Sequence, residues 1–111
     1  MATNINVGDV VMCAFPFDDN PKTRKVRPAV VVDINAEGLV VLVLKVTSKF
    51  ARNDRDYNLI DWKFAGLHKE SVVRSDKEVL ILRSDVIKRI GKLAQNDFDA
   101  VTMLYYESCK I

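Results

Sequence analysis

Runs of apolar residues separated by polar turns predict a series of short β-strands along most of the chain. The first expected strand covers residues 10–17, directly after a Gly-Asp pair. The next two, residues 27–34 and 39–46, carry β-branched residues on successive positions, which is typical of strands buried on both faces. Further strand segments are expected at residues 71–74, 79–82 and 86–93. The pattern therefore predicts a mostly β protein.

Polar stretches between these strands predict turns and loops. Residues 18–21, Asp-Asp-Asn-Pro, favour a tight turn because Asx side chains bond the local backbone and proline restricts φ. Residues 49–57 are charged and poor in apolar side chains, so we expect an exposed loop there. Residues 59–67 predict a short helical turn with Trp62 and Phe64 directed into the core.

The periodicity changes at the end of the chain, where it predicts an amphipathic helix. Asn96 is a suitable N-cap, and Asp97 and Asp99 suit the positive end of a helix dipole. Positions at helical spacing form one stripe, made of Phe98, Val101, Leu104, Tyr105 and Ser108. We therefore expect one α+β domain over residues 1–111, a small β-barrel with a C-terminal helix packed on it.

Composition excludes several classes of protein. The chain has 111 residues, of which 49% are hydrophobic, enough for one modest core. No apolar run approaches the roughly 20 residues of a membrane-spanning helix, and residues 1–9 lack the features of a signal peptide, so we expect a cytoplasmic protein. The single histidine, His68, and the distant Cys13 and Cys109 do not match a zinc site, and idle thiols are favoured over a disulfide.

The positions of the charged residues are more informative about function than the net charge of the chain. The net charge of +2 says little about nucleic acid by itself. Two clusters flank the expected strands: Lys22, Arg24, Lys25 and Arg27, then Lys45, Lys49, Arg52 and Arg55. Such clusters are usually solvated surface, but on loops they also present cations to a polyanion.

Five short segments in order carry a resemblance to a known family. They are Gly8-Asp9-Val10-Val11, Arg27-Pro28-Ala29-Val30, Val46-Thr47-Ser48-Lys49, Ser71-Val72-Val73-Arg74-Ser75-Asp76 and Arg89-Ile90-Gly91-Lys92-Leu93. Each is weak alone, but their order and spacing resemble the PemK/MazF toxins of bacterial toxin–antitoxin systems. The resemblance covers residues 8–105.

The resemblance implies an SH3-like barrel of the CcdB/MazF type that forms a homodimer. It implies a sequence-specific endoribonuclease for single-stranded RNA, with no metal or cofactor, held inactive by a cognate antitoxin. Cleavage would proceed by attack of the ribose 2′-hydroxyl, leaving a 2′,3′-cyclic phosphate and a 5′-hydroxyl. Such chemistry needs a proton acceptor, a group that assists the leaving oxygen, and donors for the extra phosphorane charge.

The expected catalytic residues are Arg27, Thr47, Arg74 and Asp76. A guanidinium suits a phosphate, and Arg27 matches the family's loop-to-strand arginine, as Thr47 matches its strand-end threonine. Arg74 and Asp76 are two residues apart, so on a strand they lie on one face and can form an ion pair. The resemblance implies acid and base roles for this Arg-x-Asp without deciding which residue has which; a paired Asp76 could accept a proton, and Arg74 is better suited to stabilise charge.

The expected RNA-binding residues surround that site and are Ser48, Lys49, Phe50, Lys22, Arg24 and Lys25. Phe50 lies next to the Thr-Ser-Lys turn and is the better candidate to stack on an unpaired base than Trp62 or Phe64. Some PemK-type enzymes carry a histidine in the loop between the first two strands, and residues 18–26 have none. His68 lies in another segment, where we interpret it as a surface residue.

Two other functions remain open at this stage. A gyrase poison of the CcdB kind shares the barrel but uses a C-terminal Trp-Gly-Ile, whereas this chain ends Ser-Cys-Lys-Ile. A non-catalytic barrel that binds RNA or protein is compatible with the missing loop histidine.

Overall fold

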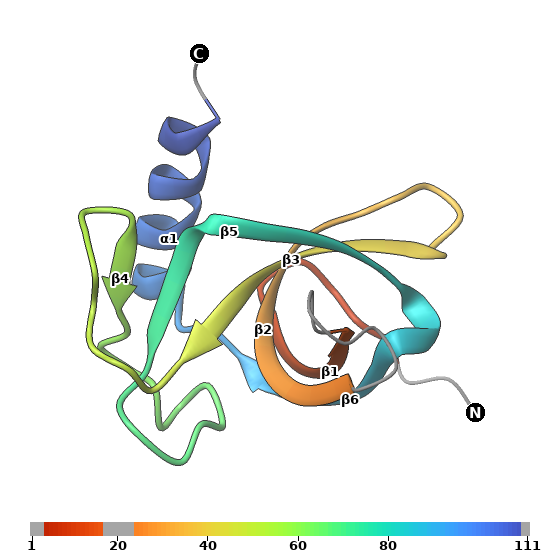
Figure 1. Cartoon of the computed structure of the whole chain (residues 1–111), viewed down its shortest axis with the longest axis horizontal. Helices are drawn as coiled ribbons and strands as arrows, with labels where there is room; N and C mark the ends of the chain where they lie inside the picture. The colour runs from red at the N-terminus through yellow and green to blue at the C-terminus, as the bar shows by residue number, and fades with distance from the viewer. Residues whose placement is uncertain (1–3, 17–23, 110–111) are drawn as a thin grey trace.

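The protein is built on one curled antiparallel sheet with a single long helix (Figure 1). The computed structural model describes residues 4–16 and 24–109. The strands are β1 (Asp9–Pro16), β2 (Arg24–Ile34), β3 (Val40–Thr47), β4 (Asp56–Asn58), β5 (Val72–Leu82) and β6 (Val86–Lys92). A 3-10 turn, η1 (Arg83–Asp85), joins β5 to β6, and α1 (Gln95–Ser108) ends the fold. The predicted turn at residues 18–21 lies outside the described residues.

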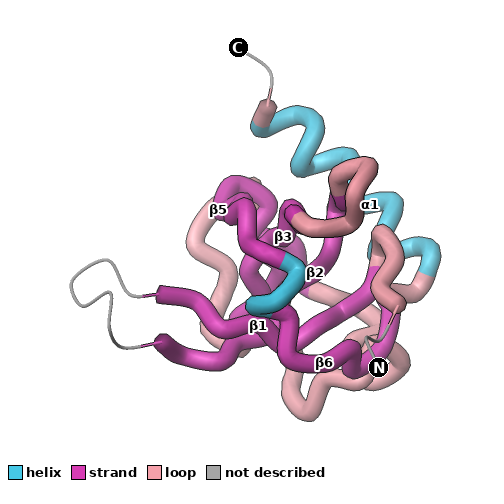
Figure 2. The backbone as a smooth tube through the Cα atoms, turned by 90° about the vertical axis from the view of Figure 1, so that its right-hand side faces the viewer, coloured by secondary structure: helices cyan, strands magenta, loops and turns pink. Residues whose placement is uncertain are grey.

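The strands pair in the order β4-β5-β3-β2-β1-β6. All pairings are antiparallel, and β4 and β6 stand at the two ends of this order, so the barrel-like sheet stays open between them. In Figure 2, α1 and the outer ends of β1 and β2 lie on opposite sides of the molecule. The mostly β class with a C-terminal helix is therefore confirmed. No helix of the described residues has the length and apolar character needed to cross a membrane.

Apolar side chains fill both faces of the sheet, which explains the unbroken β-branched runs. Val30 and Val31 are successive residues of β2, both fully buried, and they belong to two different clusters. One cluster lies beneath α1 and contains Val10, Val30, Leu44, Val46, Leu59, Ala65, Val73, Leu93 and Val101. The other contains Val11, Cys13, Phe15, Ala29, Val31, Val41, Val43, Ile81 and Val86. Strands buried on both faces are thus confirmed for β2 and β3.

The region after β3 differs from the expected pattern. Residues 72–74 and 79–82 belong to one continuous strand, β5. The polar residues between them include the buried Ser75 and the exposed Asp76, Lys77 and Glu78, and the pairing with β3 shifts register there without ending the strand. Within the charged stretch expected to be a loop, Asp56–Asn58 forms the short edge strand β4 on β5. Backbone pairing with β5 forms this strand in spite of its polar composition.

The C-terminal helix is confirmed, but its cap is not. Ala94 precedes the first turn without a capping side chain, so the predicted role of Asn96 as N-cap is wrong. Val101 is buried, and Phe98 and Tyr105 pack against the same cluster, as the stripe predicts. Asp97 is fully buried rather than placed at an exposed helix end.

The segment between β4 and β5 is a compact turn anchored on α1 and β6. Its predicted helical turn is irregular, with Ala65 N donating to Asp61 O. Trp62 packs on the core as expected, whereas Phe64 is 62% exposed and the prediction that it points inward is wrong. Gly66 touches β6 so closely that an added Cβ would lie 2.3 Å from Ile90 O, and its φ of +91° also favours glycine.

Candidate active site

A cavity of about 540 Å³ opens where the end of β3, the start of β2, β6 and the turn before β5 meet. It is lined by Met12, Arg27, Pro28, Val46, Thr47, Ser48, Lys49, Gly66, Leu67, His68, Lys69, Ser71, Lys88 and Ile90. Four residues expected at the site from the sequence, Arg27, Thr47, Ser48 and Lys49, are therefore brought together by the fold. His68, interpreted from the sequence as a surface residue, also lies in this cavity.

A second cavity of about 300 Å³ continues the first along the sheet. Its lining is Phe15, Lys25, Arg27, Lys45, Val46, Thr47, Lys49 and Arg74. Because Arg27, Val46, Thr47 and Lys49 line both cavities, the two form one continuous depression, which we call the groove. Arg27 and Thr47 stand at its centre, with Arg74 on one side and His68 on the other.

Arg27 is held on β2 while its guanidinium stays accessible. Its backbone pairs with Cys13 of β1, and the following Pro28 favours the extended conformation that this pairing requires. Nη1 donates to Val26 O at 3.1 Å, and the side chain is exposed in the groove. A guanidinium has five N–H donors in a planar fork, so one local hydrogen bond is compatible with binding a phosphate.

Thr47 is the last residue of β3, and its hydroxyl is oriented by a local turn. The backbone N–H of Lys49 donates to Thr47 Oγ1 at 3.2 Å, which leaves the hydroxyl proton able to donate to another group. Thr47 pairs with Val72 of β5, which restrains this strand end on one side. Ser48 and Lys49 follow directly and are exposed at the groove surface.

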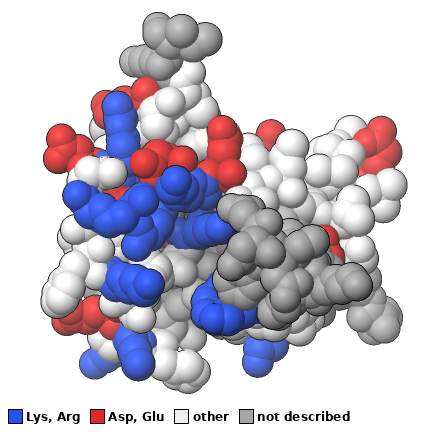
Figure 3. All heavy atoms as spheres, viewed as in Figure 1, with Lys and Arg blue, Asp and Glu red and all other residues white. Residues whose placement is uncertain are grey.

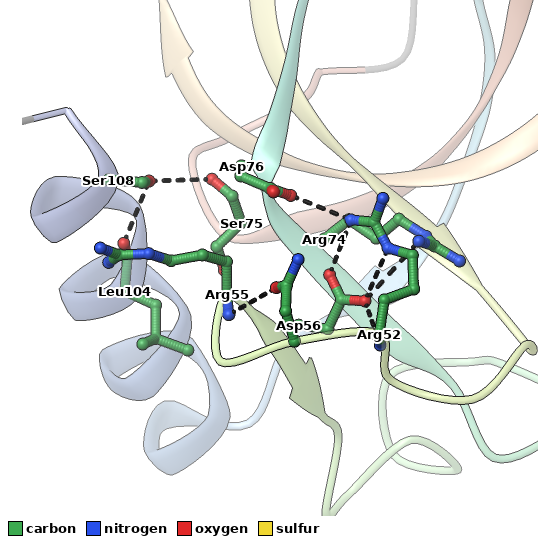
Figure 4. A network of polar contacts seen from close by, with 9 residues as sticks. Arg52, Arg55, Asp56, Arg74, Ser75, Asp76, Leu104 and Ser108 are labelled. Carbon is green, nitrogen blue, oxygen red and sulfur yellow. Dashed lines mark hydrogen bonds and ion pairs between the residues drawn. The ribbon is translucent and has the colours of Figure 1, made fainter.

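Arg74 is positioned by a carboxylate that the sequence analysis did not identify. β4 places Asp56 opposite Arg74, and Arg74 Nη1 lies 3.6 Å from Asp56 Oδ2. The Asp56 carboxylate is inaccessible to solvent and also accepts from Arg52, from Nε at 3.0 Å and from Nη2 at 3.1 Å (Figure 4). The hydrogen bond from Arg52 to Asp56 is the main cause of a raised pKa for the Arg52 guanidinium.

The predicted ion pair between Arg74 and Asp76 is wrong. Asp76 Oδ1 instead lies 3.1 Å from Nη2 of Arg52, and Asp76 does not line either cavity of the groove. The reason lies in the tertiary structure. β4 places Asp56 next to Arg74, and Arg52, in the loop before β4, forms the ion pair with Asp76 (Figure 4). Arg74 thus lies in the groove without the carboxylate that was expected to be its catalytic partner.

The groove is cationic throughout. Lys and Arg side chains gather on the left-hand part of the face seen in Figure 3, over the region where β3 ends and β5 begins. Its cationic lining residues are Lys25, Arg27, Lys45, Lys49, Lys69, Arg74 and Lys88, and among the residues that the structure describes no Asp or Glu lines either cavity. Lys45 also lies over the Phe15 ring, 5.4 Å from its centroid. Such a surface attracts a polyanion.

The other predicted RNA-binding residues are placed as follows. Lys25 lines the groove, and Phe50 follows Lys49 with its side chain 95% exposed. Lys22 lies outside the described residues, as does the side chain of Arg24. Stacking of Phe50 on a base remains a prediction.

The cysteines do not contribute chemistry to the groove. Cys13 and Cys109 are both free thiols, as expected. Burial, aided by the charge of Asp85, raises the pKa of the Cys13 thiol to about 12 and keeps it protonated and unreactive. Among residues 4–16 and 24–109, no cluster of His, Cys, Asp or Glu is suited to hold a metal ion.

Fold and groove together define a small curled-sheet protein with a central depression whose charged lining, among the described residues, is cationic. The chain belongs to the family of PemK-like, MazF-like toxins of type II toxin–antitoxin systems, whose model matches residues 6–104. No curated protein sequence matches it significantly.

Solved structures similar to this chain share its fold at low sequence identity. MazF in a MazE–MazF structure from Deinococcus radiodurans has a TM-score of 0.74 and 18% identity, with 93% of both chains covered. An endoribonuclease solved with its cognate antitoxin from a mycobacterial species has a TM-score of 0.72 and 13% identity, covering 91% of this chain and 90% of that one. The Mycobacterium tuberculosis toxin MazF-mt6 has a TM-score of 0.68 and 19% identity, covering 88% and 94%.

Proposed function

We propose that this chain is an endoribonuclease toxin that cleaves single-stranded RNA without a metal ion. The single observation that carries the proposal is the convergence of Arg27 and Thr47 at the centre of a continuous cationic groove. Membership of the toxin family and the likeness to structures described as endoribonucleases support it. Cations along the groove bind successive phosphates of an extended strand.

The chemistry is an internal displacement at phosphorus. The ribose 2′-oxygen forms a bond to the adjacent phosphorus while losing its proton, and the bond from phosphorus to the 5′-oxygen breaks. The 5′-oxygen takes up a proton, so the products are a 2′,3′-cyclic phosphate and a 5′-hydroxyl. Arg27 binds the scissile phosphate, Thr47 Oγ1 donates to one of its oxygens, and Arg74 stabilises the charge that accumulates in the transition state.

Two partners complete the proposal. The first is an antitoxin that covers the groove, since similar chains are solved together with MazE or a cognate antitoxin. The second is another copy of the chain. Leu80 and Leu82 project from one face of β5 with exposed fractions of 69% and 57%, beside the paired Leu42 and Val40 of β3. An apolar strip of this kind suits a homodimer interface.

The test is cleavage of a long single-stranded RNA in excess EDTA by the wild-type chain and by Arg27→Ala. We expect wild-type cleavage with cyclic-phosphate ends, and a rate at least about 100-fold lower for the variant, the usual cost of removing one transition-state donor. Arg55→Ala is the matched control, because it removes a guanidinium whose ion pair with Glu107, at 3.7 Å, lies away from the groove.

Three results would contradict the proposal. If a folded wild-type chain leaves the RNA intact, the proposed endoribonuclease activity is contradicted. If EDTA abolishes cleavage and a divalent cation restores it, the proposal that cleavage needs no metal ion is contradicted. Equal loss of rate in Arg55→Ala and Arg27→Ala would show that general charge, and not the placement of Arg27, carries the effect.

A further inference from the structure

His68 occupies a chemically distinct position in the groove. It lines the same cavity as Arg27 and Thr47, and it is the single histidine of the chain. Within the described part of the chain, the other titratable groups lining that cavity are Arg27, Lys49, Lys69 and Lys88, all of cationic residue types. Imidazole is the side chain whose charge ordinarily changes between pH 5 and 8. His68 therefore brings to this cavity an imidazole, the side chain that most often acts as a general acid or base in enzymes.

The fold fixes the position of the segment that carries His68. On its N-terminal side, the turn is held by Asp97, whose carboxylate accepts from Ile60 N at 3.1 Å and from Asp61 N at 2.8 Å. The backbone of Gly66 lies against Ile90 of β6, at a distance that admits no side chain. Leu59 N donates to Ser71 O at 2.9 Å and closes the loop. His68 is thus presented to the groove from a restrained turn.

The carboxylate expected to act as base is elsewhere. Asp76 is bound to Arg52 and does not line the groove, and Asp56 is enclosed between Arg52 and Arg74. A base must reach the proton that it removes. Of the groups on the described groove surface, the imidazole of His68 is the side-chain type that most often serves as a general base, and it lines the same cavity as Arg27 and Thr47.

We propose that His68 is a catalytic residue that accepts the ribose 2′-proton during RNA cleavage. The inference rests on the proposed function. As the 2′-oxygen bonds to phosphorus and the 5′-oxygen departs, the 2′-proton passes to the neutral imidazole, and the leaving oxygen takes a proton from solvent. Arg27, Lys49, Lys69 and Lys88 face this reaction from β2, the end of β3, the turn and β6, and they stabilise the phosphorane charge.

The experiment measures single-turnover rates in EDTA from pH 5 to 8.5 for wild type, His68→Ala and His68→Gln. We expect the wild-type rate to rise with pH to a plateau, as it does when a reaction depends on a general base. Both variants should be slower by about 100-fold or more, the usual contribution of a general base, and their rates should lack that rise. Glutamine keeps a hydrogen-bonding group but cannot exchange the proton, so it separates proton transfer from substrate contact. Added imidazole should restore part of the His68→Ala rate.

Glu70→Gln is the matched control, because Glu70 is exposed on the same segment and does not line the groove. Its rate and pH profile should match those of wild type. A His68→Gln variant that keeps the wild-type rate and pH profile would overturn the role of His68 and leave the endoribonuclease proposal standing. A fully inactive wild type would instead overturn both. Far-ultraviolet circular dichroism confirms that each variant is folded, and His68 is exposed, so its replacement leaves the core intact.

Discussion

At the scale of single residues, one buried carboxylate, that of Asp56, positions Arg74 at one side of the groove. Asp56 accepts hydrogen bonds from the backbone and guanidinium of Arg52 and forms an ion pair with Arg74. Its own side chain is completely buried, so no water can replace these donors at the carboxylate. The loop after β3 and the guanidinium of Arg74 therefore depend on the same two oxygen atoms.

Asp56→Asn should weaken both the anchoring of the loop after β3 and the positioning of the Arg74 guanidinium. An amide presents one acceptor oxygen and two donors, so it opposes guanidinium N–H groups with donors of its own. We expect a loss of roughly 2 kcal/mol in the free energy of unfolding, measured with urea, and slower RNA cleavage as Arg74 loses its orientation. Asp54→Asn makes the same charge change at an exposed position of that loop. Equal stability of the two variants would contradict the organising role of Asp56.

At the scale of elements, Asp97 joins α1 to the turn that carries His68. It accepts from Tyr57 Oη at 2.8 Å as well as from the backbone of Ile60 and Asp61. Burial of Tyr57, followed by this hydrogen bond, raises the pKa of its phenol to about 12. The carboxylate of Asp97 thus connects α1 to β4 and to the turn through hydrogen bonds. Each of its three donor residues is more than 35 residues away from Asp97 in the sequence.

Replacing Asp97 should lower the free energy of unfolding far more than replacing Asp99, which lies two residues further along the helix. Asp97→Ala leaves two backbone N–H groups and the Tyr57 hydroxyl without their acceptor, and we expect a loss of about 3–5 kcal/mol in the free energy of unfolding. Asp99→Ala removes the same charge from the first part of the helix, but Asp99 is exposed and accepts from Gln95. Its effect should stay within about 0.5 kcal/mol. Similar midpoints for both variants in urea unfolding would contradict this account.

The raised pKa of Tyr57 also predicts a dependence on alkaline pH. An unfolded chain has tyrosine at its ordinary pKa of about 10, so it loses the phenolic proton before the folded chain does. Stability supplied by the neutral phenol is complete below pH 10 and is lost as pH rises toward 12. Tyr57→Phe should reduce this alkaline loss in urea unfolding, although Tyr105, whose pKa is also raised by its hydrogen bond to Glu78, retains a share. An unchanged alkaline slope would contradict the assignment to Tyr57.

At the scale of the whole molecule, the helix leaves part of the sheet uncovered. Tyr105 Oη donates to Glu78 at 2.7 Å, and the apolar strip of Leu80 and Leu82 follows immediately along β5. A stable dimer typically buries about 800 Å² on each partner around an apolar centre. The proposed homodimer would place this strip at that centre.

Leu80→Asp should therefore dissociate the dimer. A desolvated carboxylate without a partner is strongly unfavourable in an interface, so we expect a monomer at micromolar concentration where the wild type sediments as a dimer. Phe64→Asp is the control, since Phe64 is 62% exposed on the turn and away from β5. A wild-type monomer, or dissociation by the control alone, would contradict the proposed interface.

The sequence by itself determined the strands other than β4, the final helix and the location of Thr47 at a strand end. Unbroken β-branched runs are stable only when both faces of a strand are covered, and residues next to a strand end must lie at the rim of the sheet. Only the tertiary structure decided which charges meet. The partner of Arg74 depends on β4, a strand whose polar residues show no strand pattern of their own, and the position of His68 depends on a glycine contact with β6. Side-chain pairing is set by register between distant segments, and that information is absent from any local stretch of the chain.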